Sequence, residues 1–68
     1  MNIPLLESAM SRNGDSRESL AKALCMSRSR LDAKMRGVEE EFRQNEIAFI
    51  RKRYRLSLEE VGKIFFES

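Results

Sequence analysis

The sequence predicts an all-α fold, a compact domain of five short helices. Its apolar residues recur at spacings of three and four, the period of an amphipathic helix, and no segment alternates long enough to form a strand. Residues that favour helix N-termini, mostly serine and asparagine, precede most of these segments. A chain of 68 residues has room for one small core, so we expect a single domain over 1–68.

The first helix is expected at 3–12. Asn2 can cap it, and Pro4 fits in the first turn, where its missing N–H costs nothing. Asn13-Gly14 is a stop signal, because glycine adopts positive φ without strain. The apolar side chains that share one face of this helix are Leu5, Leu6, Ala9 and Met10.

The second helix is expected at 17–24. Asp15 and Ser16 are both candidate caps, with Glu18 or Ser19 as the matching residue in the first turn. We favour Ser16, because the helix then has one clean inward face made of Leu20, Ala21 and Leu24. We expect Cys25-Met26 to be the tight turn that follows it, with Cys25 as a small apolar turn residue.

The third helix is expected at 28–36, capped by Ser27 and ended by Gly37. Leu31 and Met35 are spaced to face the core, which leaves most of the circumference facing outward. After a loop over 38–42, the fourth helix is expected at 44–54 and the fifth at 58–66 with Ser57 as its cap. Their expected inward residues are Ile47, Ile50 and Tyr54, then Val61, Ile64 and Phe65.

Composition excludes several function classes. Cys25 is the only cysteine and histidine is absent, so no disulfide can form within the chain and the common structural zinc sites are excluded. No catalytic constellation and no glycine-rich phosphate loop is present, so we expect neither an enzyme nor a cofactor. We expect no signal peptide and no membrane span, and a reducing, intracellular setting.

The stretch Ser16–Gly37 contains the residues with the clearest chemistry for DNA. Two short helices joined by a tight turn are typical of a helix-turn-helix, whose second helix enters the major groove. Arginine can pair with guanine through two hydrogen bonds, and serine can donate or accept, so Arg28, Ser29 and Arg30 are candidate base-reading residues. Ser27 and Arg17, at the starts of the two helices, are candidate phosphate contacts.

Residues 14–37 resemble the helix-turn-helix of the phage repressor and Cro proteins, often called the XRE family. The resemblance is carried by the Ser16 cap, by Leu20-Ala21, by Leu24 to Ser29 through the turn, and by Leu31, Met35 and Gly37. The order of five helices and the ending LSLEEVGKIFF also resemble small Cro-like regulators, which implies a lambda-repressor-like fold. Such proteins commonly bind palindromic operators in double-stranded DNA as dimers, and their usual effect is repression. The resemblance also implies a cytoplasmic location in a bacterial host cell.

The resemblance also implies roles for individual residues. Positions matching Arg28, Ser29 and Ala33 face bases, and those matching Arg17, Ser27 and Arg43 face phosphates. We also expect Arg30 and Lys34 to supply further positive contacts, and we place Lys34 and Arg36 with the phosphate-binding residues. Cys25 departs from the family pattern, because glycine usually holds this turn position.

Three other stretches leave alternatives open. Glu39–Glu41 follow the third helix, where three carboxylates can face away as a solvated loop, lower non-specific DNA affinity, or contact a basic protein. Arg51-Lys52-Arg53-Tyr54-Arg55 is either a solvated helix end or a second phosphate contact. Of the adjacent Phe65 and Phe66, only one can pack inside. The other either forms a homodimer contact with Phe49 or Leu58, or lies at the frayed end of a monomer. The rival function is a protein-interaction module that modulates a partner repressor.

Overall fold

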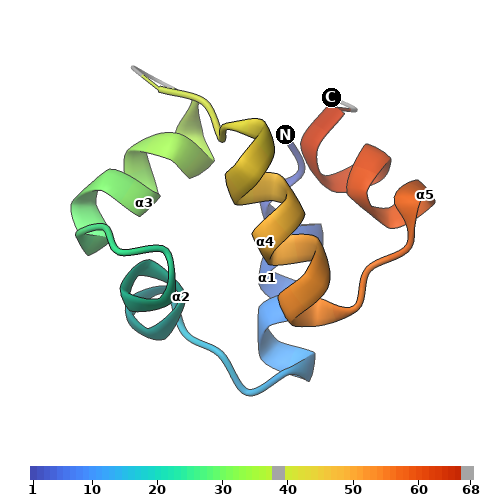
Figure 1. Ribbon diagram of the computed structural model, residues 1–68, viewed down its shortest axis with the longest axis horizontal. Helices are drawn as coiled ribbons and strands as arrows, with labels where there is room; N and C mark the ends of the chain where they lie inside the picture. Colours follow the sequence, from blue (N-terminus) through green and yellow to red (C-terminus); the bar gives the residue numbers. More distant parts are fainter. Residues whose placement is uncertain (38–39, 67–68) are drawn as a thin grey trace.

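The computed structural model describes residues 1–37 and 40–66. They form five α-helices and no strand, which confirms the all-α prediction for this part of the chain (Figure 1). The helices are α1 (Ile3–Arg12), α2 (Arg17–Ala23), α3 (Arg28–Arg36), α4 (Gln44–Tyr54) and α5 (Leu58–Val61). The last continues into a π-helical segment, η1 (Gly62–Phe66).

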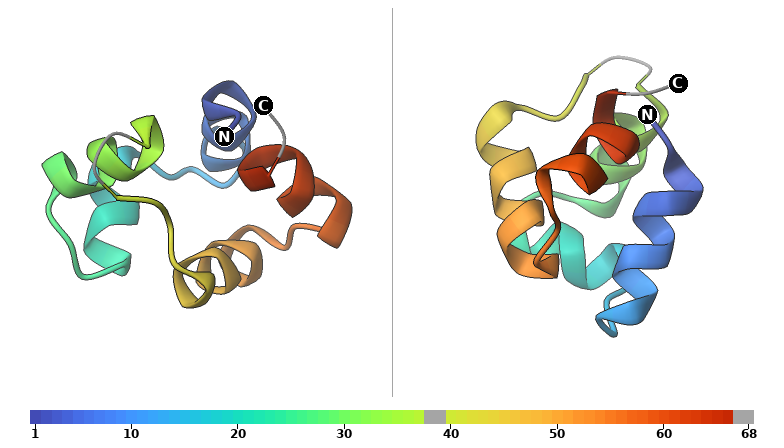
Figure 2. Two further views of the ribbon diagram at one scale, coloured as in Figure 1. Left: turned by 90° about the horizontal axis from the view of Figure 1, so that it is seen from above. Right: turned by 90° about the vertical axis from the view of Figure 1, so that its right-hand side faces the viewer.

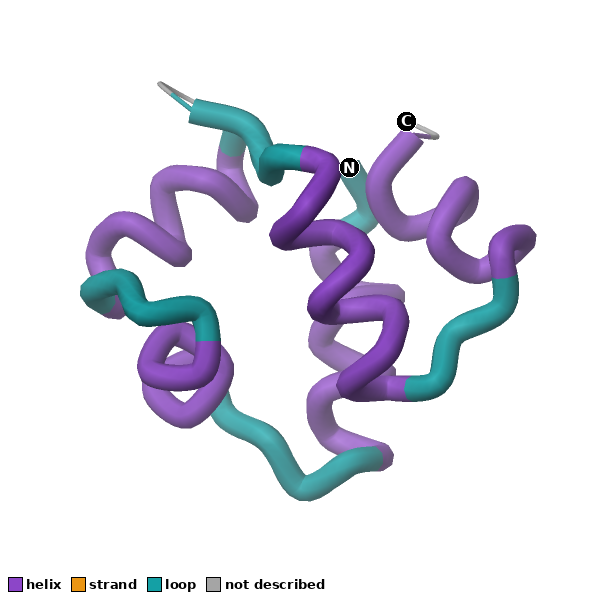
Figure 3. Tube along the Cα trace, in the orientation of Figure 1, coloured by secondary structure: helices purple, strands orange, loops and turns teal. Residues whose placement is uncertain are grey.

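The helices surround one core. In Figure 1, α2 and α3 lie together on one side, α5 lies on the other, and α4 crosses between them. The views from above and from the side show α1 and α4 on opposite sides of the core (Figure 2). The two ends of the chain meet, because the Asn2 N–H donates to the Ile64 carbonyl oxygen at 2.6 Å. Within the described residues, short loops connect the helices (Figure 3).

Every helix contributes to the core. The buried apolar residues are Leu6, Ala9, Met10, Leu20, Ala21, Leu31, Met35, Ile50, Tyr54, Leu56, Val61 and Ile64. Their positions at helical spacing explain why the elements could be located from periodicity. Phe65 packs partly against this core and meets Phe42 edge-to-face at 5.4 Å, whereas Phe66 is 71% exposed. Only one of the two phenylalanines packs, as the helical geometry requires.

The N-cap of α2 is Ser16, as the sequence favoured. The Ser16 Oγ accepts from the Ser19 N–H at 3.1 Å, and the Ser19 Oγ accepts in return from the Ser16 N–H at 2.8 Å. Asp15 is therefore free for a different role. Its carboxylate accepts hydrogen bonds from Ser19, Tyr54 and Arg53, and so ties the α1–α2 loop to the end of α4.

Two predicted boundaries need correction. Residue 24 was expected inside the second helix, but Leu24 is its C-cap and the chain turns at Cys25. The fifth helix was expected to run evenly over 58–66, but it changes to π-helical hydrogen bonding at Gly62. Cys25 has an exposed side chain and φ of 58°, a left-handed conformation that glycine adopts more easily.

Replacing Cys25 by glycine is expected to stabilise the protein. Left-handed φ costs a non-glycine residue about 1–2 kcal/mol, and the greater chain entropy of glycine offsets part of that, leaving a gain of about 0.5–1 kcal/mol. Urea unfolding of Cys25→Gly against Cys25→Ala measures it, since alanine removes the thiol without relieving the backbone. If Cys25→Gly is no more stable than Cys25→Ala, relief of the left-handed φ does not exceed the entropy cost of glycine, which would contradict the expected gain.

Candidate nucleic-acid interface

The first turn of α3 projects from the surface. Ser27 caps the helix, with its Oγ accepting from the Arg30 N–H at 3.1 Å. Arg28, Ser29 and Arg30 are all exposed. Only Leu31, Lys34 and Met35 of this helix are buried, so the sequence prediction that most of α3 faces outward is confirmed. The four residues Ser27 to Arg30 therefore form one contiguous exposed tip, which we call the α3 tip.

Arg17 lies beside this tip and joins three helices. Its Nη1 contacts Asp32 Oδ1 of α3 at 2.7 Å, and its Nη2 contacts Glu7 Oε2 of α1 at 3.0 Å. The hydrogen bonds to Asp32 and Glu7 raise the pKa of Arg17, and the bond from Arg17 lowers the pKa of Asp32. Arg17 thus holds α3 against α1 and α2, in addition to its predicted place near a phosphate.

The two arginines of the α3 tip also meet carboxylates. Arg28 lies 3.5 Å from Glu18 and 3.8 Å from Asp32. Arg30 forms a two-pronged contact with Glu40, Nε to Oε1 at 3.2 Å and Nη2 to Oε2 at 3.0 Å. Solvent-exposed ion pairs of this kind contribute about 0–1 kcal/mol, so an incoming anion can replace them at small cost.

Lys34 differs from its expected role as a surface phosphate contact. Its side chain is fully buried, and its Nζ donates to Glu46 Oε1 at 2.8 Å and to the Glu41 carbonyl oxygen at 3.5 Å. The Oε2 atom of Glu40 also lies near, 3.8 Å from the Lys34 Nζ. The ammonium is committed to joining α3 to α4, so it is not presented to an external phosphate. The position of Lys34 beside the inward Leu31 and Met35 was the one sequence signal for this burial.

The remaining predicted residues are spread more widely. Ala33 is half-buried on α3, and Arg36 is exposed at its C-terminal end. Arg43 is exposed at the N-cap of α4. Of the acidic stretch, Glu39 lies outside the described residues, Glu41 is exposed, and Glu40 turns back onto Arg30. The structure brings Ser27 to Arg30 together with Arg17, and places Arg36 and Arg43 toward the other end of α3.

A second basic cluster lies at the C-terminal end of α4. Arg51, Lys52 and Arg55 are exposed and form no ion pair with the described residues. Together with Ala48 and Leu56 they line a shallow surface depression. Arg51 also donates through Nε to the Leu56 carbonyl oxygen at 3.1 Å, which fixes its stem. Sequence reasoning found this run but could not tell which of its cations an internal carboxylate neutralises.

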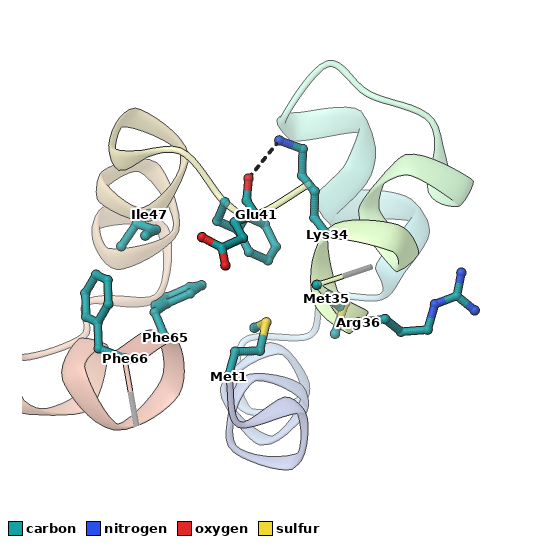
Figure 4. Close-up of a pocket in the computed structure, with 10 residues that line it drawn as sticks. Met1, Lys34, Met35, Arg36, Glu41, Ile47, Phe65 and Phe66 are labelled. Carbon is teal, nitrogen blue, oxygen red and sulfur yellow. Dashed lines mark hydrogen bonds between the residues drawn. The ribbon is translucent and has the colours of Figure 1, made fainter. Parts of the chain in front are cut away.

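A pocket of about 300 Å³ opens between α3, the start of α4 and η1 (Figure 4). Met1, Met35 and Phe65 line its floor, and the Lys34 hydrogen bond to Glu41 lies at its edge. No cluster of potential metal-ligating side chains occurs among residues 1–37 and 40–66. The pocket lining is mixed: the charged residues Lys34, Arg36 and Glu41 lie beside the apolar side chains of α4 and η1.

Searches against protein-family models, curated proteins and solved structures gave no match to this chain. Within the described part of the chain, no helix combines the length and apolar character needed to cross a membrane.

Proposed function

We propose that this protein binds double-stranded DNA sequence-specifically as a transcriptional regulator, with α2 and α3 as a helix-turn-helix of the lambda-repressor-like kind. One observation carries the proposal. Only three residues of α3 are committed to the interior, while the whole first turn, with two arginines and two serines, projects into solvent. A helix presented in this way can enter the major groove with its N-terminal residues toward base edges.

The proposed contacts divide by chemistry. Arg28 can form two hydrogen bonds to a guanine, and Ser29 can donate to or accept from a neighbouring base. The half-buried Ala33 offers a methyl group to thymine. Ser27 and the free N–H groups of α3 suit a phosphate, because the positive end of the helix dipole lies there. Arg17 and Arg43 supply the flanking phosphate contacts.

The ion pairs of the α3 tip are compatible with this role. Arg28 and Arg30 keep half of their side-chain area exposed, at 55% and 47%. A phosphate or guanine can replace an exposed carboxylate, because each such pair stabilises the protein by about 1 kcal/mol or less.

We further propose that the regulator acts as a dimer and a repressor on a palindromic operator. Leu58, at the start of α5, and Phe66, at the end of η1, are both 71% exposed, and exposed large apolar groups are typical of protein contacts. A twofold contact through α5 and η1 would present two α3 tips to two half-sites. Sedimentation of the free protein and of its DNA complex tests the stoichiometry.

Replacing Arg28 by alanine is expected to weaken binding to the preferred site by about 1–3 kcal/mol, because a two-pronged base contact is lost. The preferred site is obtained by selection from a random duplex library with wild-type protein. Fluorescence anisotropy then compares that site with a scrambled duplex of equal length. Binding to the scrambled duplex should change far less.

Lys63→Ala is the matched control, since Lys63 is also exposed and paired with a carboxylate, Glu59, but lies in η1 away from α3. It should leave both affinities unchanged apart from a small general charge effect. An equal loss on both duplexes for Arg28→Ala would contradict base reading. A loss on combined replacement of Lys52 and Arg55, without one for Arg28, would move the interface to α4.

The competing function is a protein-interaction module, favoured by the same exposed Leu58 and Phe66. A module of this kind would bind a partner repressor through the apolar edge near α5. Salt separates the two functions, since affinity for DNA falls steeply with salt in proportion to the phosphates contacted. Apolar protein contacts depend on salt only weakly.

A further inference from the structure

Glu40 is placed as if it were a ligand of Arg30. Its two carboxylate oxygens meet Nε and Nη2 of the guanidinium at 3.2 and 3.0 Å, one prong each. This fork is the geometry that a guanidinium also uses for a phosphate or for the O6 and N7 atoms of guanine. An anion that binds the Nε/Nη2 edge of Arg30 from outside must therefore take the position that Glu40 fills.

The Glu40 carboxylate also lies near a second cation, on the side of the protein interior. Glu40 Oε2 lies 3.8 Å from the Nζ of the buried Lys34, which is itself fixed by Glu46 at 2.8 Å. The hydrogen bond from Arg30 lowers the pKa of Glu40, so the carboxylate stays charged at neutral pH. Glu40 is consequently oriented by two cations, one exposed and one buried.

We propose that Glu40 lowers the affinity of this protein for random-sequence DNA by occupying Arg30 as an internal substitute for phosphate. The inference rests on the proposed DNA-binding function and adds to it a residue that opposes sequence-independent binding. Such binding is almost wholly a matter of phosphate contacts and counterion release. In the wild-type protein, Arg30 must give up its contact with the Glu40 carboxylate before it binds a phosphate. The new contact with phosphate therefore adds little to sequence-independent binding.

The test compares Glu40→Gln with wild type on a random-sequence duplex, by fluorescence anisotropy over a series of salt concentrations. Freeing Arg30 adds about one phosphate contact, so the slope of log K against log salt should steepen by about 0.9. If the two proteins bind equally at about 1 M salt, this difference in slope makes Glu40→Gln bind about eightfold more tightly than wild type at about 0.1 M. Glu59→Gln removes the same charge from an exposed ion pair on α5, and should change the affinity by less than about twofold.

A double-mutant cycle assigns the effect to the pair. In an Arg30→Gln background, Glu40→Gln should give no gain beyond that of Glu59→Gln. The variants should keep the wild-type circular dichroism spectrum and a Tm within about 5 °C of it, since an exposed pair contributes little stability.

Three results would overturn the inference. If Glu40→Gln binds random DNA no more tightly than Glu59→Gln, Glu40 does not compete with phosphate. If the gain persists without Arg30, the effect is one of general charge. If neither wild type nor any variant binds a duplex at low salt, the inference fails together with the proposed function, whereas the first two results leave that function standing.

Discussion

Replacing Glu46 by alanine is expected to destabilise the protein by about 3 kcal/mol, because it leaves a buried cation without its main partner. The Lys34 side chain has no exposed area and its Nζ donates to Glu46 Oε1 at 2.8 Å. The same oxygen accepts from the Arg43 N–H at 2.8 Å, at the start of α4. Burial raises the pKa of Glu46, but its bonds from Arg43 and Lys34 more than compensate and leave it lowered. Urea unfolding monitored by circular dichroism measures the loss.

Two further variants separate the loss of the Glu46 charge from the loss of its hydrogen-bond acceptor and from the unpaired Lys34 cation. Glu46→Gln keeps an acceptor for both donors and removes only the charge, so its loss should be smaller than that of alanine. Lys34→Met in the Glu46→Ala background removes the unpaired charge and should recover most of the stability, as apolar replacement of buried ion pairs generally does. If Glu46→Ala costs less than about 1 kcal/mol, Lys34 does not depend on Glu46.

Replacing Asp15 by asparagine is expected to cost about 2–4 kcal/mol, because it breaks a nearly buried charged network. The Asp15 side chain is 8% exposed and accepts from Arg53 Nε at 2.7 Å, from Tyr54 Oη at 2.6 Å and from Ser19 Oγ at 2.6 Å. An asparagine amide has one oxygen and cannot satisfy the Arg53 fork together with the tyrosine. Thermal and urea unfolding of Asp15→Asn measure the loss.

The same network gives the stability a dependence on pH. The hydrogen bond from Arg53, with those from Ser19 and Tyr54, holds the pKa of Asp15 far below its ordinary value of 3.8 despite burial. A carboxyl whose folded pKa is lowered stabilises the protein above its unfolded pKa, and that contribution is lost as pH falls. Wild-type stability should therefore fall below about pH 4, and less steeply in Asp15→Asn. The part that remains comes from the other carboxyls with lowered pKa: Asp32, Glu40, Glu46 and Glu60.

Tyr54→Phe provides the companion measurement. Burial, and then the bond to Asp15, raise the pKa of the Tyr54 hydroxyl, which therefore stays protonated as a donor. Removing the hydroxyl alone should cost about 1 kcal/mol, and the two substitutions together should cost less than their sum. Strict additivity, or an acid profile that Asp15→Asn leaves unchanged, would show that Asp15 does not stabilise the fold through this network.

Local signals predicted most of the fold. The helices at 3–12, 28–36 and 44–54 have the predicted bounds, because their caps, stops and apolar spacing are set by neighbouring residues. Ser16 and Ser27 cap as expected. The π-helical segment at Gly62 had no such signal, since it depends on how the end of the chain docks onto α1.

The candidate site was only partly predictable, because local signals show which side chains are exposed but not which residues pair across the fold. Exposure of Arg28, Ser29 and Arg30 followed from the period of the helix. The carboxylates that pair with the cations could not be predicted, because Arg30 and Glu40 are ten residues apart and Arg53 and Asp15 are 38 apart. Those pairings are set by the tertiary fold, and they decide which positive charges remain available to a partner.

The measurement that tests the DNA-binding account most directly is an NMR titration of the amide signals with the selected duplex. If α3 enters the major groove, the largest shifts should fall on Ser27 to Ala33 and on the N-terminal turn of α2 near Arg17. The amides of α5 should move little at the same saturation. Shifts confined to the end of α4 around Lys52 and Arg55, or no shifts with any duplex at low salt, would contradict the central claim.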